Sequence, residues 1–425
     1  MPKTGVKFTK LKMSKRYKSN LLNEGYNNNP ILFDKAKGSI IYSRKRKYID
    51  LSNGAGTIFL GHNNTVFRKS LIKYLNLKLS NFAHPNIAAH NFSLTLKKVF
   101  PEYSKFIFCN TGAEANLKAI RIAKAITKKN LIVNVTGSWH GSIDQLLFNS
   151  GKNLKKISLS DGIDPEFKKN LVYIPYNDVK NSKKILNKYK KKICSVLVEP
   201  IQGGLPTKTS EKYLKFLSEY CKKKGIILIF DEVLSGVRFN CSSLHSIFKI
   251  KPNISTFGKI IGGGLPIGLI GIDKSVEKKI SSKKLRIFFG GTHSGNSLST
   301  YVGNDILSYI LKNKKKIFNK IESQSNKFEN QINNFVKKNN IDVRIIRFDS
   351  LIRIVFSKKS IANRLQRDFF EKKKYQKREK FIAYLRNKGI FFPTNGVLTF
   401  TYSLTNQQLN YLISTITKSL KKFFS

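Results

Sequence analysis

The sequence predicts an α/β fold with a mainly parallel sheet in a large domain, together with a smaller α+β domain. Two observations carry this prediction. Short, nearly continuous apolar runs rich in β-branched residues recur between about residues 66 and 300, as expected of parallel strands buried on both faces. Segments with helical periodicity separate these runs, and this alternation is typical of a parallel sheet. We therefore expect the large α/β domain over residues 66–300.

The individual elements follow in chain order. Residues 30–60 carry short strand and turn patterns, and we assign residues 1–65 to an N-terminal segment of the small domain. A helix with one apolar stripe is expected over residues 114–126. Beyond residue 300 the chain is helical, then gives two strand-like pieces, VRIIRF and LIRIVFS, and a final helix, so residues 301–425 form the C-terminal small α+β domain. The expected strands of the large domain are the apolar runs at 105–110, 130–135, 193–200, 225–233 and 254–259.

The composition describes a globular chain with a large core. Of the 425 residues, 40% are hydrophobic and 12% aromatic, and no apolar run approaches the roughly 20 residues of a membrane helix. The N-terminus, MPKTGVKFTKLKMSKRYK, lacks the apolar centre of a secretory signal, and an organellar presequence is the weaker interpretation. Four scattered cysteines show no metal-ligand spacing, which indicates reduced, mostly buried thiols in a cytoplasmic protein without a metal site.

The formal net charge of +54 has two interpretations. It can mark a protein that binds nucleic acid or another polyanion, or it can reflect a general drift of the composition toward Lys, Asn, Ile and Phe. Lysine is spread along the chain, which favours drift and predicts no specific nucleic-acid partner. A non-catalytic, basic polyanion-binding protein on the same fold stays open as the alternative from a different functional class.

Ligands of open α/β sheets bind beyond the carboxyl ends of the strands, so the residues after each apolar run are the candidate site. Thr111 and Gly112 follow the first run and begin a helix, where free N–H groups can hold a phosphate; an ordinary helix cap is the alternative. Trp139 stands between Gly137 and Gly141 after the second run. Its ring can stack on a flat ligand or fill the core.

Two charged side chains follow buried runs. Asp231 comes after five apolar residues, where a carboxylate needs a positive partner; a capping aspartate or a buried ion pair, such as one with Arg238, is the alternative to a ligand. Lys259 follows the run ISTF within the glycine-rich GKIIGGGLPIG, and such apolar surroundings favour the uncharged, nucleophilic amine. A phosphate cradle, a stacking aromatic ring, a buried aspartate and a desolvated lysine together fit one cofactor, pyridoxal 5'-phosphate.

The order of six motifs resembles a known family. NTGAEA, GSWHG, VEPIQGG, DEVLSGVRF, GKIIGGGLPIG and GGTHSGNS follow one another as in the class III aminotransferases, and within that family the chain resembles the glutamate-1-semialdehyde 2,1-aminomutase branch most. The similarity runs from KAKGSIIYS to GIFFPTNG and spans most of the chain. The resemblance implies the pyridoxal-phosphate-dependent transferase fold of type I, and a homodimeric enzyme with shared active sites that transfers an amino group on a small amino or aldehyde substrate.

The resemblance also implies catalytic and phosphate-binding residues. Lys259 would form the Schiff base with the cofactor and carry a proton during the reaction, and Asp231 would pair with the pyridine nitrogen. Gly112 and Ala113 would offer their N–H groups to the cofactor phosphate, although the motif here lacks the usual Ser-Gly-Thr order. Thr292 would reach a phosphate bound by the other subunit.

Three further positions would contact the cofactor ring by the same resemblance. Trp139 and Val233 would pack on its two faces, and Gln202 would lie near its phenolic oxygen, in the same loop as Glu199. The substrate is less determined, because the aminomutase typically has Ser-Pro-Val-Arg near its N-terminus where this chain reads NNNPILF, without the arginine that can meet a substrate carboxylate.

Two activities therefore stay open. One is the isomerase reaction of the aminomutase, glutamate-1-semialdehyde to 5-aminolevulinate. The other is class III transaminase activity on another amine, aldehyde or keto substrate, such as an amino sugar or a secondary metabolite. The motifs disfavour a decarboxylase or a racemase on the same fold.

Overall fold

The computed structural model describes residues 31–44, 46–207, 211–282 and 284–425. Its largest sheet has seven strands in the order β4-β12-β11-β10-β9-β5-β8, and β12 alone among them runs antiparallel to its neighbours. In this order the strands are β4 Lys105–Cys109, β12 Gly268–Ile272, β11 Ile254–Gly258, β10 Ile227–Asp231, β9 Ile193–Val198, β5 Leu131–Val135 and β8 Leu171–Ile174. All five expected apolar runs form strands of this sheet, and the prediction omitted β8 and β12.

Both faces of the large sheet are buried, as the continuous apolar runs predict. Along β9, Cys194 and Leu197 pack into one hydrophobic core, whereas Val196 and Val198 pack into a second core on the other face. The first core takes residues from α4 (Gly112–Thr127) and α9 (Lys274–Ser281), and the second from α6 (Val179–Tyr189) and α7 (Glu211–Lys224). Helix α4 contains the predicted helix 114–126 and extends it by a few residues.

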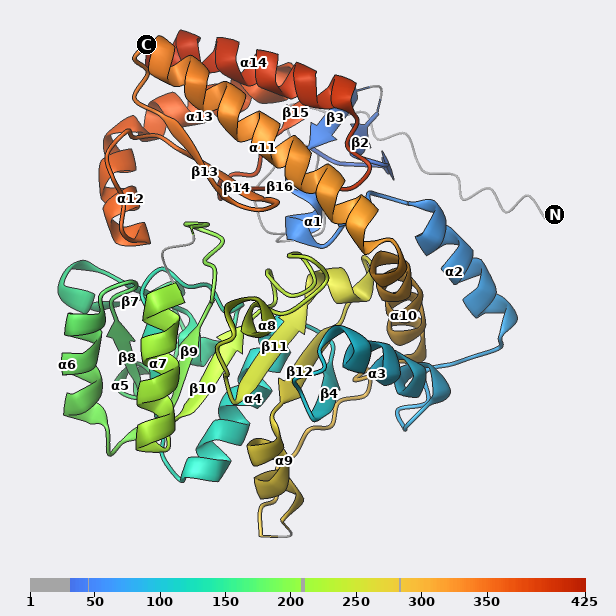
Figure 1. Ribbon diagram of the computed structural model, residues 1–425, viewed down its shortest axis with the longest axis vertical. Coiled ribbons are helices and arrows are strands. Elements are labelled where there is room, and N and C mark those ends of the chain that lie inside the picture. The colour runs from blue at the N-terminus through green and yellow to red at the C-terminus, as the bar shows by residue number, and fades with distance from the viewer. Residues whose placement is uncertain (1–30, 45, 208–210, 283) are drawn as a thin grey trace.

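Segments from the two ends of the chain share one small sheet above the large one (Figure 1). Its order is β1-β2-β3-β15, and β15 pairs in parallel with β3 through Ile390 and Ile49. A second small sheet has the order β13-β14-β16, in which β13 and β14 are the two expected strand-like pieces. The domain boundaries at residues 65 and 300 stay predictions. The strands are β1 Lys35–Lys37, β2 Ile40–Ser43, β3 Arg46–Asp50, β13 Arg344–Phe348, β14 Leu351–Val355, β15 Ile390–Phe391 and β16 Val397–Thr399.

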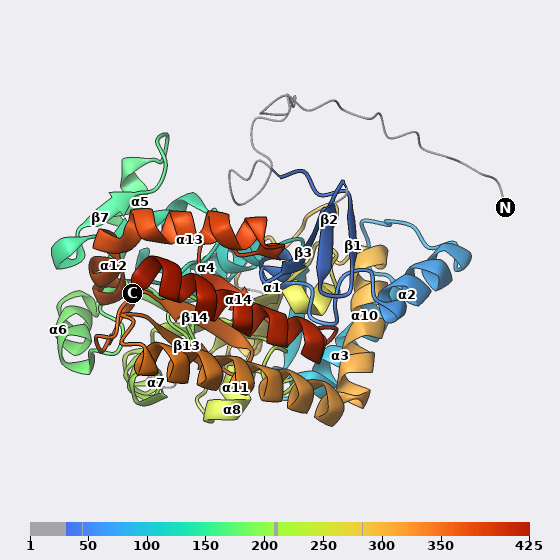
Figure 2. The same ribbon diagram turned by 90° about the horizontal axis from the view of Figure 1, so that it is seen from above.

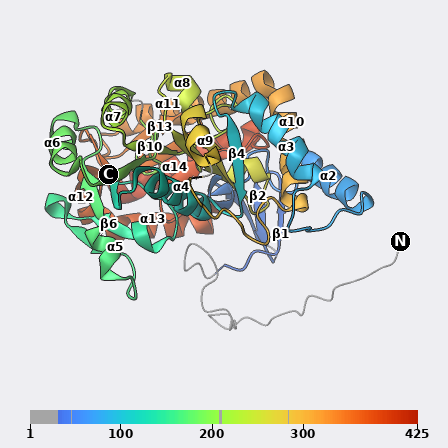
Figure 3. The ribbon, with the colours of Figure 1, turned by 90° about the horizontal axis from the view of Figure 1, so that it is seen from below.

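Long helices cover the small sheets and one end of the large sheet. Seen from above, α14 lies between α11 and α13, with which it is in contact (Figure 2). At one end of the large sheet α10 packs against α2 and α3, and α6 and α7 lie toward the other end (Figure 3). None of the helices in the described ranges is long and apolar enough to cross a membrane. The bounds are α2 Thr65–Asn76, α3 Ile87–Val99, α10 Ser297–Lys312, α11 Lys314–Lys338, α13 Tyr375–Asn387 and α14 Asn406–Phe424.

The cysteine prediction is confirmed, because all four cysteines are buried and free of disulfides. Burial raises the pKa of two of these thiols, Cys109 and Cys241, to about 12, which keeps them protonated and unreactive. The basic N-terminal stretch and the first part of NNNPILF lie outside the described residues.

Candidate active site

The carboxyl ends of six strands meet at one edge of the large sheet. Gly268 at the start of the antiparallel β12 pairs with both Gly258 and Cys109, so the ends of β11 and β4 are level. A cavity of about 690 Å³ lies at this edge. It is where a doubly covered parallel sheet is expected to bind a ligand. Of the site residues named from the sequence, those that line the cavity are Thr111, Gly112, Ala113, Trp139, Glu199, Asp231, Val233 and Lys259.

Asp231, the last residue of β10, is a buried carboxylate held from three directions. Its Oδ2 accepts hydrogen bonds from Asn116 Nδ2 and His140 Nδ1, both at 2.7 Å, and its Oδ1 accepts one from Val233 N at 3.0 Å. The hydroxyl of Thr256 donates to Asn116 Oδ1 at 2.6 Å, which turns the amide nitrogen of Asn116 toward the carboxylate. The carboxylate is therefore fixed in one orientation at the cavity wall.

Arg238 is not the partner of Asp231. This arginine is fully buried, but its guanidinium donates to the backbone carbonyl oxygens of Leu234 and Gly56. The side chain that Asp231 meets instead is the imidazole of His140, which carries a charge only when it is protonated. An Arg238–Asp231 ion pair, which was the alternative to a ligand at this position, is thus not formed.

Lys259 begins the 3₁₀ turn η4 (Lys259–Gly262) directly after β11. Its φ of 51° lies in the left-handed region, which costs a non-glycine residue about 1 kcal/mol or more. Burial lowers the pKa of its amine, and Arg238 lowers it further, against the opposing effect of Asp231 and Glu199. The amine is therefore more easily deprotonated than that of an exposed lysine.

The N-terminus of α4 forms the other wall of the cavity. Thr111 caps the helix through a hydrogen bond from Glu114 N to its Oγ1 at 3.0 Å, so the N–H groups of Gly112 and Ala113 come first in the helix and have no acceptor within it. A Cβ at Gly112 would lie 2.6 Å from Val233 Cγ1, which only glycine avoids. This helix end can hold an anion such as a phosphate.

Trp139 and Glu199 join two loops of the site. Trp139 lines the cavity with 41% of its surface exposed, and its backbone N–H donates to Glu199 Oε1 at 2.7 Å. Glu199 Oε2 accepts a further hydrogen bond from Gly203 N at 3.2 Å. Burial raises the pKa of Glu199 to about 7, so this carboxyl exchanges its proton near neutral pH.

Two residues named from the sequence do not line the cavity. Gln202 is buried, and its Nε2 donates to Thr136 O at 2.9 Å and to Ser138 Oγ at 3.1 Å, while its Oε1 has no hydrogen-bond partner in the described part of the chain. Thr292 is exposed, and its carbonyl oxygen accepts a hydrogen bond from Asn81 Nδ2 at 3.3 Å. Neither position is brought to the cavity by this chain alone.

Sequence reasoning did not assign several residues of the cavity wall to the site. Asn116 is one polar residue within a predicted helix, and nothing in the sequence distinguishes it. Three arginines of the wall were also not assigned, because they belong to the predicted small domain: Arg353, Arg364 and Arg367. Arg364 and Arg367 are three positions apart, which places both side chains on one face of a helix. This spacing was the one sequence signal that could have pointed to them. Among 79 basic residues this pair does not stand out.

The residues fit pyridoxal 5'-phosphate. The buried Asp231 meets no lysine or arginine in the described chain, so a cationic ring nitrogen in the cavity would supply the missing charge partner. The Oε1 of Gln202 is a buried polar atom that the described part of the chain leaves unsatisfied. Asp231 ends β10 and Gln202 follows β9, so both lie at the same sheet edge as the start of α4.

Comparison with known proteins gives one consistent result. Residues 21–420 match the family model described as aminotransferase class-III. Among curated relatives, the glutamate-1-semialdehyde 2,1-aminomutase of Thermoplasma volcanium is 34% identical over 77% of this chain and 78% of its own length. The protein of the same name from Thermodesulfovibrio yellowstonii is 29% identical over 85% of this chain and 84% of its own.

Solved structures show the same fold. An omega-transaminase from Sphaerobacter thermophilus superposes with a TM-score of 0.86 at 20% identity, covering 93% of this chain and 92% of its own. A glutamate-1-semialdehyde-aminomutase from Pseudomonas aeruginosa gives 0.82 at 15% identity, covering 93% and 89%. These likenesses confirm the fold expected from the sequence.

Proposed function

The chain belongs to the class III aminotransferases, which are pyridoxal-phosphate-dependent enzymes, and we propose that it is a glutamate-1-semialdehyde 2,1-aminomutase. The reaction moves an amino group to the neighbouring aldehyde carbon of the same molecule and gives 5-aminolevulinate. One observation carries the proposal at the level of the site: Lys259, with a lowered pKa, and the buried Asp231 line a single cavity. The names of the curated relatives support the choice of substrate.

We propose that the wall residues hold the cofactor in one orientation. The N–H groups of Gly112 and Ala113 bind its phosphate, and Asp231 keeps its ring nitrogen protonated, since a fixed carboxylate stabilises that charge. Trp139 and Val233 pack on the two ring faces. When bound, pyridoxal phosphate supplies an aldehyde that bonds to amines and a protonated ring that accepts electrons.

Lys259 is the proposed proton carrier. Because burial lowers the pKa of its amine, more of the neutral form is present near pH 7 than for an exposed lysine. The neutral Nζ would move a proton between the substrate carbon that bears nitrogen and the cofactor, whose protonated ring would take up the electron pair left on that carbon. Lys259 is the one lysine among the described residues of the cavity wall, so no second lysine competes for this role.

The remaining two assignments concern the loop of Gln202 and the partner subunit. Gln202 Oε1, unpartnered in this chain, is proposed to face the phenolic oxygen of the cofactor. Thr292 is exposed and does not line its own cavity, which supports its proposed place at the phosphate bound by a second copy in a homodimer. The four reduced, buried cysteines support the proposal of a cytoplasmic enzyme.

The experiment is incubation of the purified holoenzyme with glutamate-1-semialdehyde alone. We expect 5-aminolevulinate to form without any keto acid, and Lys259→Ala to give none. Turnover that begins only after a keto acid is added would assign the chain to the transaminases instead. The stretch NNNPILF, which lacks an arginine, is the observation that favours this second candidate.

A further inference from the structure

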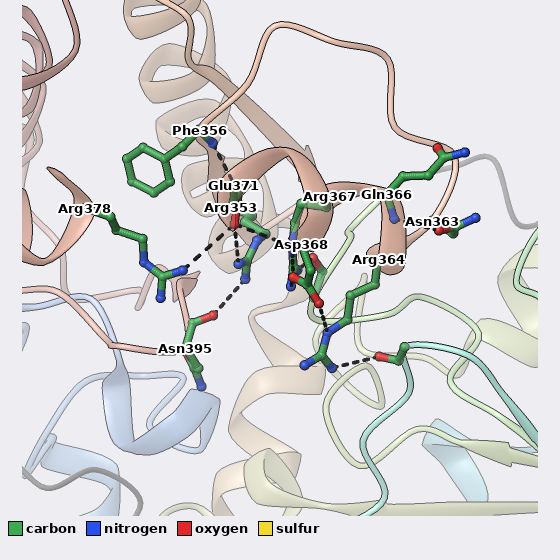
Figure 4. Close-up of polar contacts among 12 residues, drawn as sticks. Arg353, Phe356, Asn363, Arg364, Gln366, Arg367, Asp368, Glu371, Arg378 and Asn395 are labelled. Carbon is green, nitrogen blue, oxygen red and sulfur yellow. Dashed lines mark hydrogen bonds and ion pairs between the residues drawn. The ribbon is translucent and has the colours of Figure 1, made fainter. Parts of the chain in front are cut away.

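Four arginines of the C-terminal part gather beside the cavity (Figure 4). Arg353 lies on β14, Arg364 and Arg367 lie on α12 (Arg364–Glu371), and Arg378 lies on α13. We call these four residues the arginine cluster. Arg353, Arg364 and Arg367 line the cavity, and Arg378 does not.

The arginine cluster carries more positive charge than its neighbours balance. Glu371 Oε2 lies 3.7 Å from Arg353 Nη2 and from Arg367 Nε, and 3.9 Å from Arg378 Nη1, so one carboxylate is shared by three guanidinium groups. Asp368 pairs with Arg367 and, at 3.5 Å, with Arg364. Four arginines against two carboxylates leave two positive charges in excess.

Two of the four guanidinium groups, those of Arg353 and Arg367, are buried, which makes their charge costly without a further anion. Arg353 and Arg367 are only 3% and 4% exposed. The Nη1 of Arg353 donates to Asn395 O at 2.8 Å, but its Nε is buried without a hydrogen-bond partner. Two buried guanidinium groups that share one carboxylate, together with an unsatisfied Nε donor beside a cavity, are what an anionic ligand would relieve.

Two of these side chains donate hydrogen bonds to loops at the edge of the large sheet. Arg364 Nη1 donates to Gly137 O at 3.1 Å, and Arg367 Nη1 donates to Gly204 O. A Cβ at Gly137 would lie 2.8 Å from Arg364 Cβ, and one at Gly204 would lie 3.2 Å from Arg367 Nη1. The absence of side chains at these two positions therefore lets the guanidinium groups approach the cavity.

The arginine cluster is separate from the proposed phosphate cradle at the start of α4. Gly137 and Gly204 follow β5 and β9, whereas Thr111 and Gly112 follow β4, and four strands lie between β4 and β5 in the sheet. The cavity thus has two places for an anion. The first is taken by the cofactor phosphate in the proposed function.

We propose, resting on that function, that the arginine cluster binds an oxyanion of the substrate and so selects amino or aldehyde substrates that carry a carboxylate or a phosphate. The planar guanidinium group presents paired N–H donors that match both anions. Arg364 is the side chain that contacts this group most freely, because it lines the cavity with 31% of its side chain exposed. The cluster supplies the positive charge that NNNPILF lacks.

The test is calorimetric titration of the holoenzyme with two pairs of carbonyl compounds. Levulinate is compared with methyl levulinate, and hydroxyacetone phosphate with hydroxyacetone. We expect at least one charged compound to bind about 10- to 100-fold more tightly than its neutral counterpart, as for charge-assisted hydrogen bonds. The pair with the larger ratio identifies the anion as a carboxylate or a phosphate.

Variants connect this discrimination to the arginine cluster. Arg364→Gln should bring the ratio of charged to neutral affinity close to 1, and Arg364→Lys should retain part of it, since charge remains and the planar fork is lost. Arg121→Gln is the matched control, because Arg121 is exposed and also donates to a backbone carbonyl, Phe288 O at 2.7 Å. It should keep the wild-type ratio.

Two outcomes would overturn the inference. One is equal affinity for the charged and neutral compounds of both pairs; the other is a ratio that Arg364→Gln leaves unchanged, with only the melting temperature lowered, as a purely structural ion network predicts. Because calorimetry does not depend on turnover, a holoenzyme that discriminates charge but makes no 5-aminolevulinate would reject the proposed mutase and retain the anion site.

Discussion

The carboxylate of Asp231 and the imidazole of His140 lie 2.7 Å apart although 91 positions separate them in the chain. The other ring nitrogen of His140 lies 3.0 Å from Asn134 Oδ1, so a hydrogen-bond network runs from β5 to the end of β10. All three residues are buried. This hydrogen-bond network orients Asp231 before any ligand binds, and preorganised charge of this kind is a main source of catalytic rate.

Asp231→Asn should therefore lower kcat by about 10²- to 10³-fold, because the neutral amide cannot stabilise a protonated ring nitrogen. Steady-state kinetics measure the change in kcat, and the absorption spectrum of the holoenzyme reports the state of the cofactor ring. Asp178→Asn is the control, since Asp178 is a half-buried helix cap away from the cavity and asparagine caps equally well. An Asp231→Asn enzyme within about threefold of wild type would contradict the proposed charge pairing.

Lys259→Ala should lower kcat by at least about 10⁴-fold, because the proposed nucleophile and proton carrier are lost together. In the native protein, borohydride should attach a pyridoxyl group to Lys259 alone, as read by peptide mass spectrometry. The control is Lys320→Ala, because burial also lowers the pKa of Lys320 but its amine donates to Tyr402 O away from the cavity. Labelling of another lysine would refute the assignment.

Gly112→Ala should weaken cofactor binding and stability by about 1–3 kcal/mol, since the new Cβ overlaps Val233 Cγ1 at 2.6 Å. The double variant Gly112→Ala/Val233→Ala should recover part of this loss by removing the methyl group in the way. Cofactor titration and thermal unfolding give both quantities. Strict additivity of the two single effects would show that the contact with Val233 is not the cause.

Glu199 should make stability fall with rising pH. Its folded pKa of about 7 is raised above the value of an unfolded chain, so its contribution is fully present below pH 4 and is lost as the pH rises through 7. Between pH 5 and 8, the unfolding free energy of wild type should drop relative to Glu199→Gln by up to about 3 kcal/mol. Denaturant unfolding at several pH values, with both proteins in the same cofactor state, measures the difference in slope. Parallel pH profiles would mean that Glu199 titrates normally.

Much of the fold and of the site can be predicted from the sequence because the signals for both lie within short segments. A parallel strand buried on both faces is a short apolar run, and the sheet edge where ligands bind is the next few residues, so Asp231 and Lys259 could be named without a structure. The strands β8 and β12 are harder to predict. The four residues of β8 are too few to show a period, and β12 is divided by Gly271.

Sequence by itself determined the family motifs, the apolar strands and the two charged residues behind them, because each depends on residues within one short segment. Only the tertiary structure decided that His140 and Asn116 meet Asp231, that Gln202 and Thr292 stay off this cavity wall, and that Arg353, Arg364 and Arg367 reach the site. The physical reason is that a buried polar group pairs with whatever lies next to it in space, and α12 is brought against loops more than 150 positions earlier in the chain.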